Sequence, residues 1–214
     1  GEDTMTGAME AESSRILAAV HRDLRERVEL SDADWARIRP HLSLQETGSK
    51  HQLQAIGEPV SRHYFLLRGL VRFYYLSPEG KELNKAFYAE GNIVGNLSAL
   101  ILNEPSRFAI ETLEPSLLLV FPFEPLKQLV SDCPGWDRLF NYGCQMMLLR
   151  NERREAELLT LSAAERFRQF VHNFPRALER IPQYHIASYL GISPEALSRF
   201  KRQWLQEADK NTPT

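Results

Sequence analysis

Residues Ile181 to Trp204 read IPQYHIASYLGISPEALSRFKRQW, and this stretch decides the fold of the C-terminal part of the chain. Pro182 fits the first turn of a helix, where its missing N–H group costs no hydrogen bond. Gly191 fits the position just after a helix, where a left-handed backbone favours glycine. Ser193 and Pro194 then fit the N-cap and the first position of a second helix. The stretch therefore predicts two helices joined by a tight turn, the pattern of a helix-turn-helix.

The second helix of this motif has two chemically different faces. Leu197, Phe200 and Trp204 fall at i, i+3 and i+7, so we expect them to point inward. On the other face, arginine can bond guanine, glutamate can accept from cytosine, and basic residues farther along can contact phosphates. The predicted DNA-binding residues are Gln183, Tyr184, Ser193, Pro194, Glu195, Ser198, Arg199, Lys201 and Arg202. An ordinary helical hairpin with a solvated charged face is the alternative interpretation.

The segment from about Leu42 to Phe121 has the texture of short strands. Runs of β-branched and aromatic residues alternate there with Gly, Pro and Asn, and Val71 and Phe73 alternate with Arg72 in the pattern of a half-buried strand. The sequence Ser77-Pro78-Glu79-Gly80 is typical of a tight turn between two strands. Several short strands at this spacing predict an antiparallel roll or barrel.

Helical patterns precede and follow these strands. Apolar periodicity predicts a helix over Ser13 to Leu30, and Gly135 to Leu161 consists mainly of good helix formers. A helix of about 25 residues is about 38 Å long, more than a small roll can cover, so part of it is expected to pack on a partner chain. Folding back within one chain is the alternative. The chain then divides into residues 13–134, the long helix and hinge at 135–161, and the helix-turn-helix at 162–208, with an α+β fold class overall.

Composition and charge narrow the classes of protein. Hydrophobic residues make up 43% of the 214 residues and charged residues 25%, which is typical of a folded protein. The net charge is −2, but the chain from Leu159 onward carries eight basic and five acidic residues, a local +3. An acidic front and a basic back indicate that a polyanion partner meets the C-terminal part.

The N-terminal sequence and the two cysteines indicate where in the cell the protein is expected. Gly1 to Ser14 lacks the pattern of a signal peptide and is interpreted as an expression remnant with a loose terminus. No apolar run is long enough to span a bilayer, so no membrane partner is expected. Cys133 and Cys144 form neither a metal pattern nor a disulfide framework, which favours two reduced thiols and a cytoplasmic protein.

The order of these segments and their motifs resemble the Crp/Fnr family of transcription regulators, from about Ser31 to Leu205. Landmarks of the resemblance are Leu67-Arg-Gly69, Glu79-Gly-Lys-Glu82, Gly91-Asn-Ile-Val-Gly95 and SPEALSR at Ser193 to Arg199. It implies a cyclic-nucleotide-binding-type β-roll, a long dimerisation helix and an all-α domain of winged-helix type. It also implies a homodimer on double-stranded DNA that contacts RNA polymerase, with Glu195 and Arg199 as base-contacting residues. Pro194 replaces an arginine common in the family.

The resemblance implies an effector pocket that departs from the cAMP-binding pattern. Where cAMP-binding members have Gly-Glu-Leu and then Arg-Ser/Thr-Ala, this chain has Gly95-Asn96-Leu97 and Arg107-Phe108-Ala109. The predicted pocket residues are Gly95, Asn96, Leu97, Arg107, Phe108, Asn151 and Glu152. Losing the partner of a buried polar ligand group costs about 1–3 kcal/mol, so we expect a regulator that does not respond to cAMP, has no cofactor, and uses an unknown effector or none.

The sequence also leaves alternative functions open, both within this family and outside it. Within the family, a cAMP-responsive regulator is an alternative, and so is a haem-based one, with His51 or His63 as the candidate ligand. A metal-dependent β-barrel enzyme would need clustered His and Glu ligands, but these histidines stand alone in the sequence, so no enzyme activity is expected. A ligand-binding module that acts on a protein partner remains a third class, against which the helix-turn-helix pattern argues.

Overall fold

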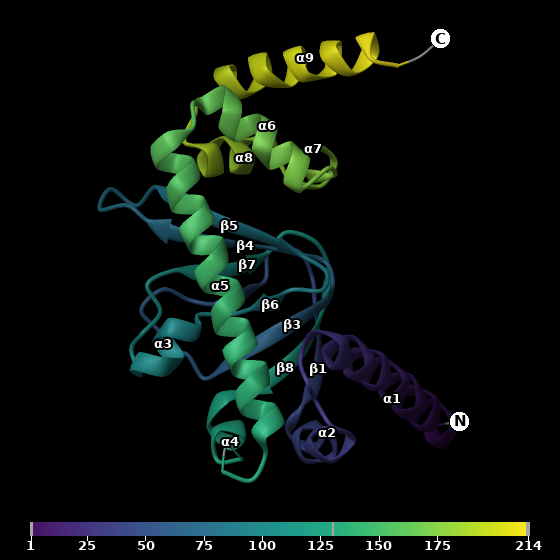
Figure 1. Cartoon of the computed structure of the whole chain (residues 1–214). Helices are drawn as coiled ribbons and strands as arrows, with labels where there is room; N and C mark the ends of the chain where they lie inside the picture. The colour runs from purple at the N-terminus through teal and green to yellow at the C-terminus, as the bar shows by residue number, and fades with distance from the viewer. Residues whose placement is uncertain (1, 130, 213–214) are drawn as a thin grey trace.

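The strand segments form two antiparallel four-stranded sheets in a computed structural model that describes residues 2–129 and 131–212 (Figure 1). One sheet has the order β1 (Ser43–Thr47), β8 (Ser116–Pro122), β3 (Arg62–Arg68) and β6 (Ile93–Val94). The other has the order β2 (Gln52–Gln54), β7 (Ala109–Thr112), β4 (Leu70–Leu76) and β5 (Glu82–Ala89). Apolar side chains of both sheets, including Leu66, Phe73, Ile110 and Leu118, form one buried cluster. The predicted antiparallel roll is confirmed.

The turn between β4 and β5 has the chemistry that its sequence predicts. The N–H of Ser77 donates to the Lys81 carbonyl over 2.8 Å, and the N–H of Lys81 donates to Ser77 Oγ over 3.0 Å. Gly80 has a φ of +82°, a backbone conformation that glycine adopts without steric cost. The turn therefore fixes the pairing of β4 with β5.

Helices pack against the end of the roll that is remote from the C-terminus. They are α1 (Glu2–Arg27), α2 (Asp32–Ile38), the short 3-10 helix η1 (Arg39–His41) and α4 (Phe123–Lys127). Leu24, Ile38 and Leu126 pack there with Trp136 in a second buried cluster. The expectation of a loose terminus up to Ser14 differs from the structure, in which α1 is helical from Glu2 onward and is anchored by buried Val20 and Leu24. Gly1 lies outside the described residues.

The long helix is α5 (Pro134–Thr160), one residue from the predicted boundaries at each end. Its first half packs on the roll through Trp136, Leu139 and Gly143. Its second half exposes four leucines, Leu148, Leu149, Leu158 and Leu159, which are 63%, 54%, 45% and 77% accessible.

Four helices form the C-terminal part: α6 (Ala163–Asn173), α7 (Ala177–Arg180), α8 (Gln183–Leu190) and α9 (Pro194–Lys210). Ser162 begins α6 with a reciprocal capping box, in which its Oγ accepts from the Glu165 N–H and its N–H donates to the Glu165 carboxylate. Residues 162–212 are described as helices and their connections without any strand, which agrees with the all-α C-terminal domain that the resemblance implies. Helix α7 occupies the short link before α8, and α9 runs on to Lys210.

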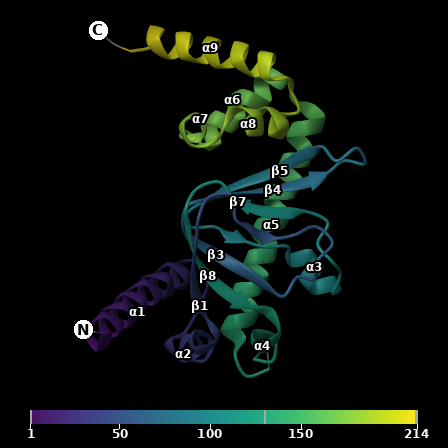
Figure 2. The same cartoon turned by 180° about the vertical axis from the view of Figure 1, so that it is seen from behind.

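The C-terminal helices share a core with the roll. Leu70 and Phe87 of the β4–β5 sheet pack with Phe167, Ile186 and Leu190 of the helices. Figures 1 and 2 show these helices stacked over the β5 side of the roll from both directions. This cover explains why β4 is buried on both faces from Leu70 to Tyr74, where the sequence predicted a half-buried strand.

Candidate nucleic-acid interface and effector pocket

The helix-turn-helix of α8 and α9 has the caps that its sequence predicts. Gly191 ends α8 in the left-handed conformation, with a φ of +67°, and its N–H points to the carbonyls of Ala187 and Ser188. Ser193 begins α9, and its Oγ accepts from the Ala196 N–H over 3.1 Å. Leu197 is fully buried between the helices, with Phe200 and Trp204 partly buried beside it. The inward face of α9 is confirmed.

The outward face of α9 is polar and accessible. Glu195, Ser198, Arg199 and Arg202 are exposed, while Lys201 is half-buried. Within residues 2–129 and 131–212, neither Glu195 nor Arg199 takes part in an ion pair or a side-chain hydrogen bond, and the Arg199 guanidinium lies 5.3 Å from the Phe200 ring centroid. These donors and acceptors are thus available to an external partner.

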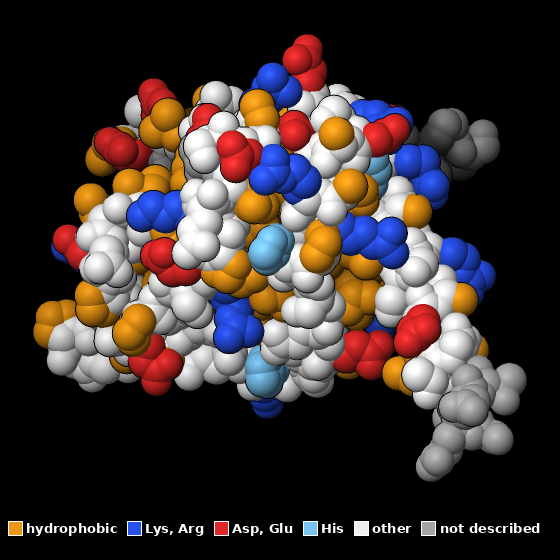
Figure 3. Space-filling view, turned by 90° about the horizontal axis from the view of Figure 1, so that it is seen from below, with side chains coloured by type: hydrophobic (Ala, Val, Ile, Leu, Met, Phe, Trp, Pro, Cys, Tyr) orange, Lys and Arg blue, Asp and Glu red, His pale blue; other side chains and the backbone are white. Residues whose placement is uncertain are grey.

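The remaining predicted DNA contacts lie at the starts of the two helices. Gln183 and Tyr184 occupy the first turn of α8 and are exposed, and Ser193 and Pro194 begin α9. The opposite end of the molecule, seen from below in Figure 3, presents acidic and basic side chains interspersed with apolar ones.

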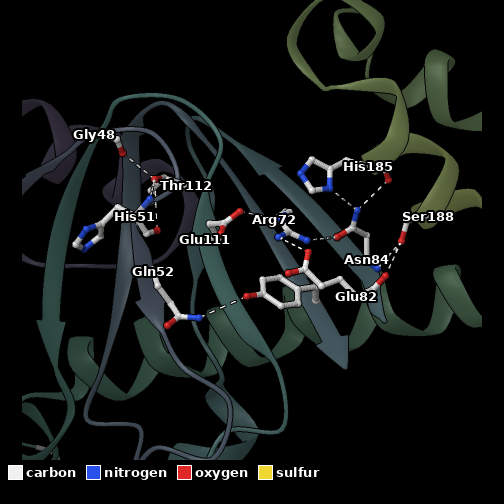
Figure 4. A network of polar contacts seen from close by, with 11 residues as sticks. Gly48, His51, Gln52, Arg72, Glu82, Asn84, Glu111, Thr112, His185 and Ser188 are labelled. Carbon is white, nitrogen blue, oxygen red and sulfur yellow. Dashed lines mark hydrogen bonds and ion pairs between the residues drawn. The ribbon is translucent and has the colours of Figure 1, made fainter. Parts of the chain in front are cut away.

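A buried arginine connects the roll to the helix-turn-helix (Figure 4). Arg72 on β4 is only 3% exposed, and it donates to Glu111 over 3.0 Å, to Glu82 over 2.7 Å and to Asn84 Oδ1 over 2.9 Å. Its guanidinium lies 3.9 Å from the Tyr74 ring centroid. Two carboxylates and an amide compensate the buried charge, as burial of an arginine requires.

Asn84 carries this network to α8. Its Nδ2 donates to the His185 carbonyl over 2.9 Å and lies 3.1 Å from His185 Nδ1, and its backbone N–H donates to Ser188 Oγ over 3.1 Å. Burial, followed by the positive charge of Arg72, lowers the pKa of His185 to about 4. The imidazole is therefore neutral at pH 7. This network was not predicted from the sequence. Its one signal there was that Arg72 and Asn84 are polar side chains inside predicted strands.

A second polar clamp holds α7 to the roll. Arg180 donates to both Glu114 and Glu90 over 2.8 Å, and to the Gly69 carbonyl over 3.1 Å. Hydrogen bonds to Glu114 and then Glu90 raise the pKa of Arg180. The C-terminal helices are thus attached to the β4–β5 sheet by polar contacts on two sides of the shared core.

The predicted effector cassette is held by its own side chains. Asn96 caps α3 (Leu97–Leu102) by accepting from the Ala99 N–H, and its Nδ2 donates to the buried Ser106 Oγ over 3.0 Å. Phe108 is buried and stacks on Phe73 with 5.0 Å between ring centroids. A Cβ added at Gly95 would meet His63 Cβ at 2.7 Å, so this glycine permits close packing. Asn96 and Phe108 therefore serve the packing of the roll.

The predicted pocket residues are only partly brought together. Asn96, Arg107 and Phe108 line a cavity of about 250 Å³ beside α3, where the Arg107 side chain is 84% exposed and 4.0 Å from Glu104. Asn151 lines a different cavity and accepts from Lys85 Nζ over 2.9 Å. Leu97 is buried in the roll, and Glu152 is exposed on α5. No single described cavity gathers the whole predicted set.

The histidines and cysteines that other functions would need do not form a metal-binding site among the described residues. His63 is buried in an aromatic stack with Phe121 and Trp136, and His51 is exposed. In the described part of the chain, no three His, Cys, Asp or Glu side chains gather closely enough to hold a metal ion. Cys133 and Cys144 are free thiols whose pKa values burial raises.

None of the described helices combines the length and apolar character that crossing a membrane requires.

Sequence comparison relates the chain to regulators. Residues 50–133 match the family model of the cyclic nucleotide-binding domain. The chain is 27% identical over 159 residues to the anaerobic regulatory protein of Pasteurella multocida (strain Pm70), covering 67% of this chain and 56% of that one. It is 32% identical over 97 residues to the global nitrogen regulator of Nostoc sp., covering 45% of this chain and 44% of the relative. The chain thus spans less than two thirds of these relatives.

Solved structures share the fold. The structure of FixK2 from Bradyrhizobium japonicum matches with a TM-score of 0.70 at 21% identity, over 78% of this chain and 86% of that one. A putative transcriptional regulator of the crp/fnr family from Eubacterium rectale matches with a TM-score of 0.66 at 20% identity, over 84% and 85%. The relatives and neighbours that these comparisons name are regulators rather than enzymes.

Proposed function

We propose that this chain, as a member of the Crp/Fnr family of transcription regulators, binds DNA as a homodimer. Its targets are specific sites on double-stranded DNA. The observation that supports this most directly is the free polar face of α9. Glu195 and Arg199 are exposed one helical turn apart, on a helix whose other face is fixed by buried Leu197. A helix of this kind enters the major groove and reads base edges with its N-terminal residues.

Each predicted contact then has a distinct role. Arg199 bonds guanine, Glu195 accepts from cytosine, and Ser198 bonds a base edge or a phosphate. Lys201 and Arg202 lie farther along α9 and contact phosphates, while Ser193, Pro194, Gln183 and Tyr184 lie at the two helix starts that approach the backbone. Action on the chromosome places the protein in the cytoplasm, and contact with RNA polymerase follows from the family.

The homodimer forms through α5 in this proposal. Leu148, Leu149 and Leu159 expose large apolar side chains along the half of α5 that the roll does not cover. Burying such side chains against a second copy is favourable by about 25 cal/mol for each Å² removed from water. A two-fold pair presents two α9 helices, which must lie about 34 Å apart to read one palindromic site.

The cyclic-nucleotide-type pocket is degenerate in this proposal, so cAMP is not the effector. A cyclic phosphate needs several donors that converge on it, but Arg107 is exposed, Asn96 is engaged with Ser106, and Phe108 fills the position of a hydroxyl residue. Regulation then requires another ligand or none.

Selection from a randomised duplex library, followed by binding titrations with the Arg199→Ala variant, tests the proposal. We expect the variant to lose about 1–3 kcal/mol of affinity, roughly 5- to 150-fold, for the selected site and little for an unrelated duplex. Arg15→Ala, an exposed arginine on α1, is the matched control and should bind like the unmodified protein. Equal losses on every duplex, or no selected sequence at all, would count against base reading by α9.

A further inference from the structure

A cavity lies where the roll, the long helix and the C-terminal helices meet. It has a volume of about 300 Å³ and is separate from the cavity beside α3. Its walls come from β5, from the second half of α5, and from α6 and α8. A ligand in this cavity would therefore contact both the roll and the DNA-reading domain.

The walls of this cavity carry an excess of positive charge. Lys85, Arg150, Arg153 and Arg154 line it, and Glu157 is the one acidic side chain among its lining residues. Two of the guanidinium groups lie against aromatic rings, Arg150 at 4.6 Å from the centroid of Tyr88 and Arg154 at 3.7 Å from that of Tyr189. The rings hold the cations in place but do not neutralise them.

Partial burial makes three of these cations, Lys85, Arg150 and Arg154, costly without an anion, whereas Arg153 is exposed. Burial, and then the charge of Arg154, lowers the pKa of the Lys85 amine, and burial lowers the pKa of the Arg154 guanidinium. Nη1 of Arg150 is buried and has no hydrogen-bond partner among the described residues, although Nη2 bonds Asn92. Lys85 and Arg154 use neutral acceptors, the Asn151 amide and the Tyr189 carbonyl. Buried charges in proteins are normally paired, and here the pairing is incomplete.

We propose that this cavity binds a small polyanion, a metabolite with at least two phosphate or carboxylate groups, and is the effector site of the protein. Lys85 and Arg153 contact the anion from opposite walls, and Arg150 and Arg154 supply the fixed positive field between them. Because the cavity joins three parts of the fold, the bound anion stabilises the arrangement of the C-terminal helices on the roll. The regulatory meaning of the site, though not its existence, rests on the proposed function.

Calorimetric titration of the protein with pyrophosphate tests the site, with ionic strength held constant by sodium chloride and no phosphate in the buffer. We expect one pyrophosphate per chain and a rise in the thermal midpoint. The double variant Lys85→Gln/Arg153→Gln should bind at least tenfold more weakly, the order expected for losing charged hydrogen bonds. A parallel titration with citrate distinguishes a phosphate ligand from a carboxylate ligand, and binding of either supports a polyanion site.

Two further variants separate this cavity from other basic surfaces. Arg15→Gln/Lys127→Gln removes the same charge from exposed positions on α1 and α4 and should bind pyrophosphate normally. Arg199→Ala/Arg202→Ala should also bind it normally, because α9 does not line the cavity. If the double cavity variant does not fold, Arg153→Gln alone is used, since Arg153 is exposed.

The inference is overturned if pyrophosphate and citrate both fail to bind, if the α1/α4 control loses as much affinity as the cavity variant, or if only the α9 variant loses binding. The DNA titrations give an independent readout. Normal DNA binding without anion binding rejects the cavity site alone, whereas anion binding without any specific DNA binding rejects the proposed function alone.

Discussion

At the scale of single residues, two buried histidines couple the stability of the fold to pH. His63 packs against both Phe121 and Trp136, at 5.1 and 5.7 Å between ring centroids, and its buried Nδ1 has no partner among the described residues. Burial lowers the pKa of His63 to about 3 and that of His185 to about 4. Both imidazoles are therefore neutral in the folded protein over the physiological range.

Stability should fall on acidification and fall less in His63→Phe. Below the ordinary histidine pKa of 6.5, both histidines become protonated in the unfolded chain, but in the folded protein they stay neutral down to about pH 3 to 4. The free energy of unfolding therefore decreases as the pH falls below 6.5 and is fully retained above it. Phenylalanine preserves the stack without a proton site. Urea unfolding at pH 7.5 and pH 5.0 should show about 2 kcal/mol less pH loss in the variant.

Exposed His172 provides the control for this experiment. His172→Gln should keep the full difference between the two pH values. A His63→Phe protein that loses as much stability as the unmodified chain would show that His63 takes up a proton in the folded state as readily as in the unfolded chain.

Residues whose roles are local could be predicted from the sequence, and residues with distant partners could not. The caps at Gly191 and Ser193 depend on neighbours within four positions. Asn84 and His185 are 101 positions apart and meet only because the C-terminal helices dock on β5. For the same reason, Arg150, Arg153 and Arg154 could be assigned to a predicted helix from the sequence, but the cavity that they line could not be predicted.

At the scale of elements, the two halves of α5 pack differently: the second half contacts the roll and α8 through polar side chains such as Arg150 and Arg154. Its first half is buried on the roll, and its second half exposes Leu148, Leu149 and Leu159. Local helix propensity and the Pro134 start predicted its extent to within one residue. The all-α character of the C-terminal domain, which the resemblance implies, agrees with the helices described over residues 162–212.

The exposed leucines of α5 should control assembly. We expect the unmodified chain to be a dimer at micromolar concentration, as proposed above, and Leu148→Glu/Leu159→Glu to be monomeric, because four carboxylates would face one another across the two-fold axis. Sedimentation velocity measures this directly. Met9→Glu, on exposed α1, should remain dimeric. A double variant that still sediments as a dimer would exclude α5 as the interface.

At the scale of the whole molecule, the roll and the C-terminal helices do not have separate cores. Leu70 on β4 is fully buried among side chains of α6 and α8. The predicted boundaries at 134 and 161 divide the chain into successive segments, but the C-terminal helices pack back on the roll. The charge pattern along the sequence could not predict this docking, because the docked surface is apolar at its centre.

Thermal unfolding should therefore occur as one cooperative transition. We expect a single calorimetric endotherm, and Leu70→Ala should lower the free energy of unfolding by about 2–5 kcal/mol, as for other fully buried leucines. Leu76→Ala, in the same strand but 49% exposed, is the matched control and should change little. Two resolved endotherms, with only the later one moved by Leu70→Ala, would show that the two parts unfold independently.

The stacking of α9 on α6 and α8, at the far side from the sheet (Figure 1), makes it a lever arm. A helix of 17 residues is about 25 Å long, so tilting its base by about 10° moves its tip by about 4 Å. That displacement exceeds the 3.4 Å step between adjacent nucleotides of one strand. A slight rotation of α8 on β5 is thus enough to put a pair of such arms out of register with a palindrome.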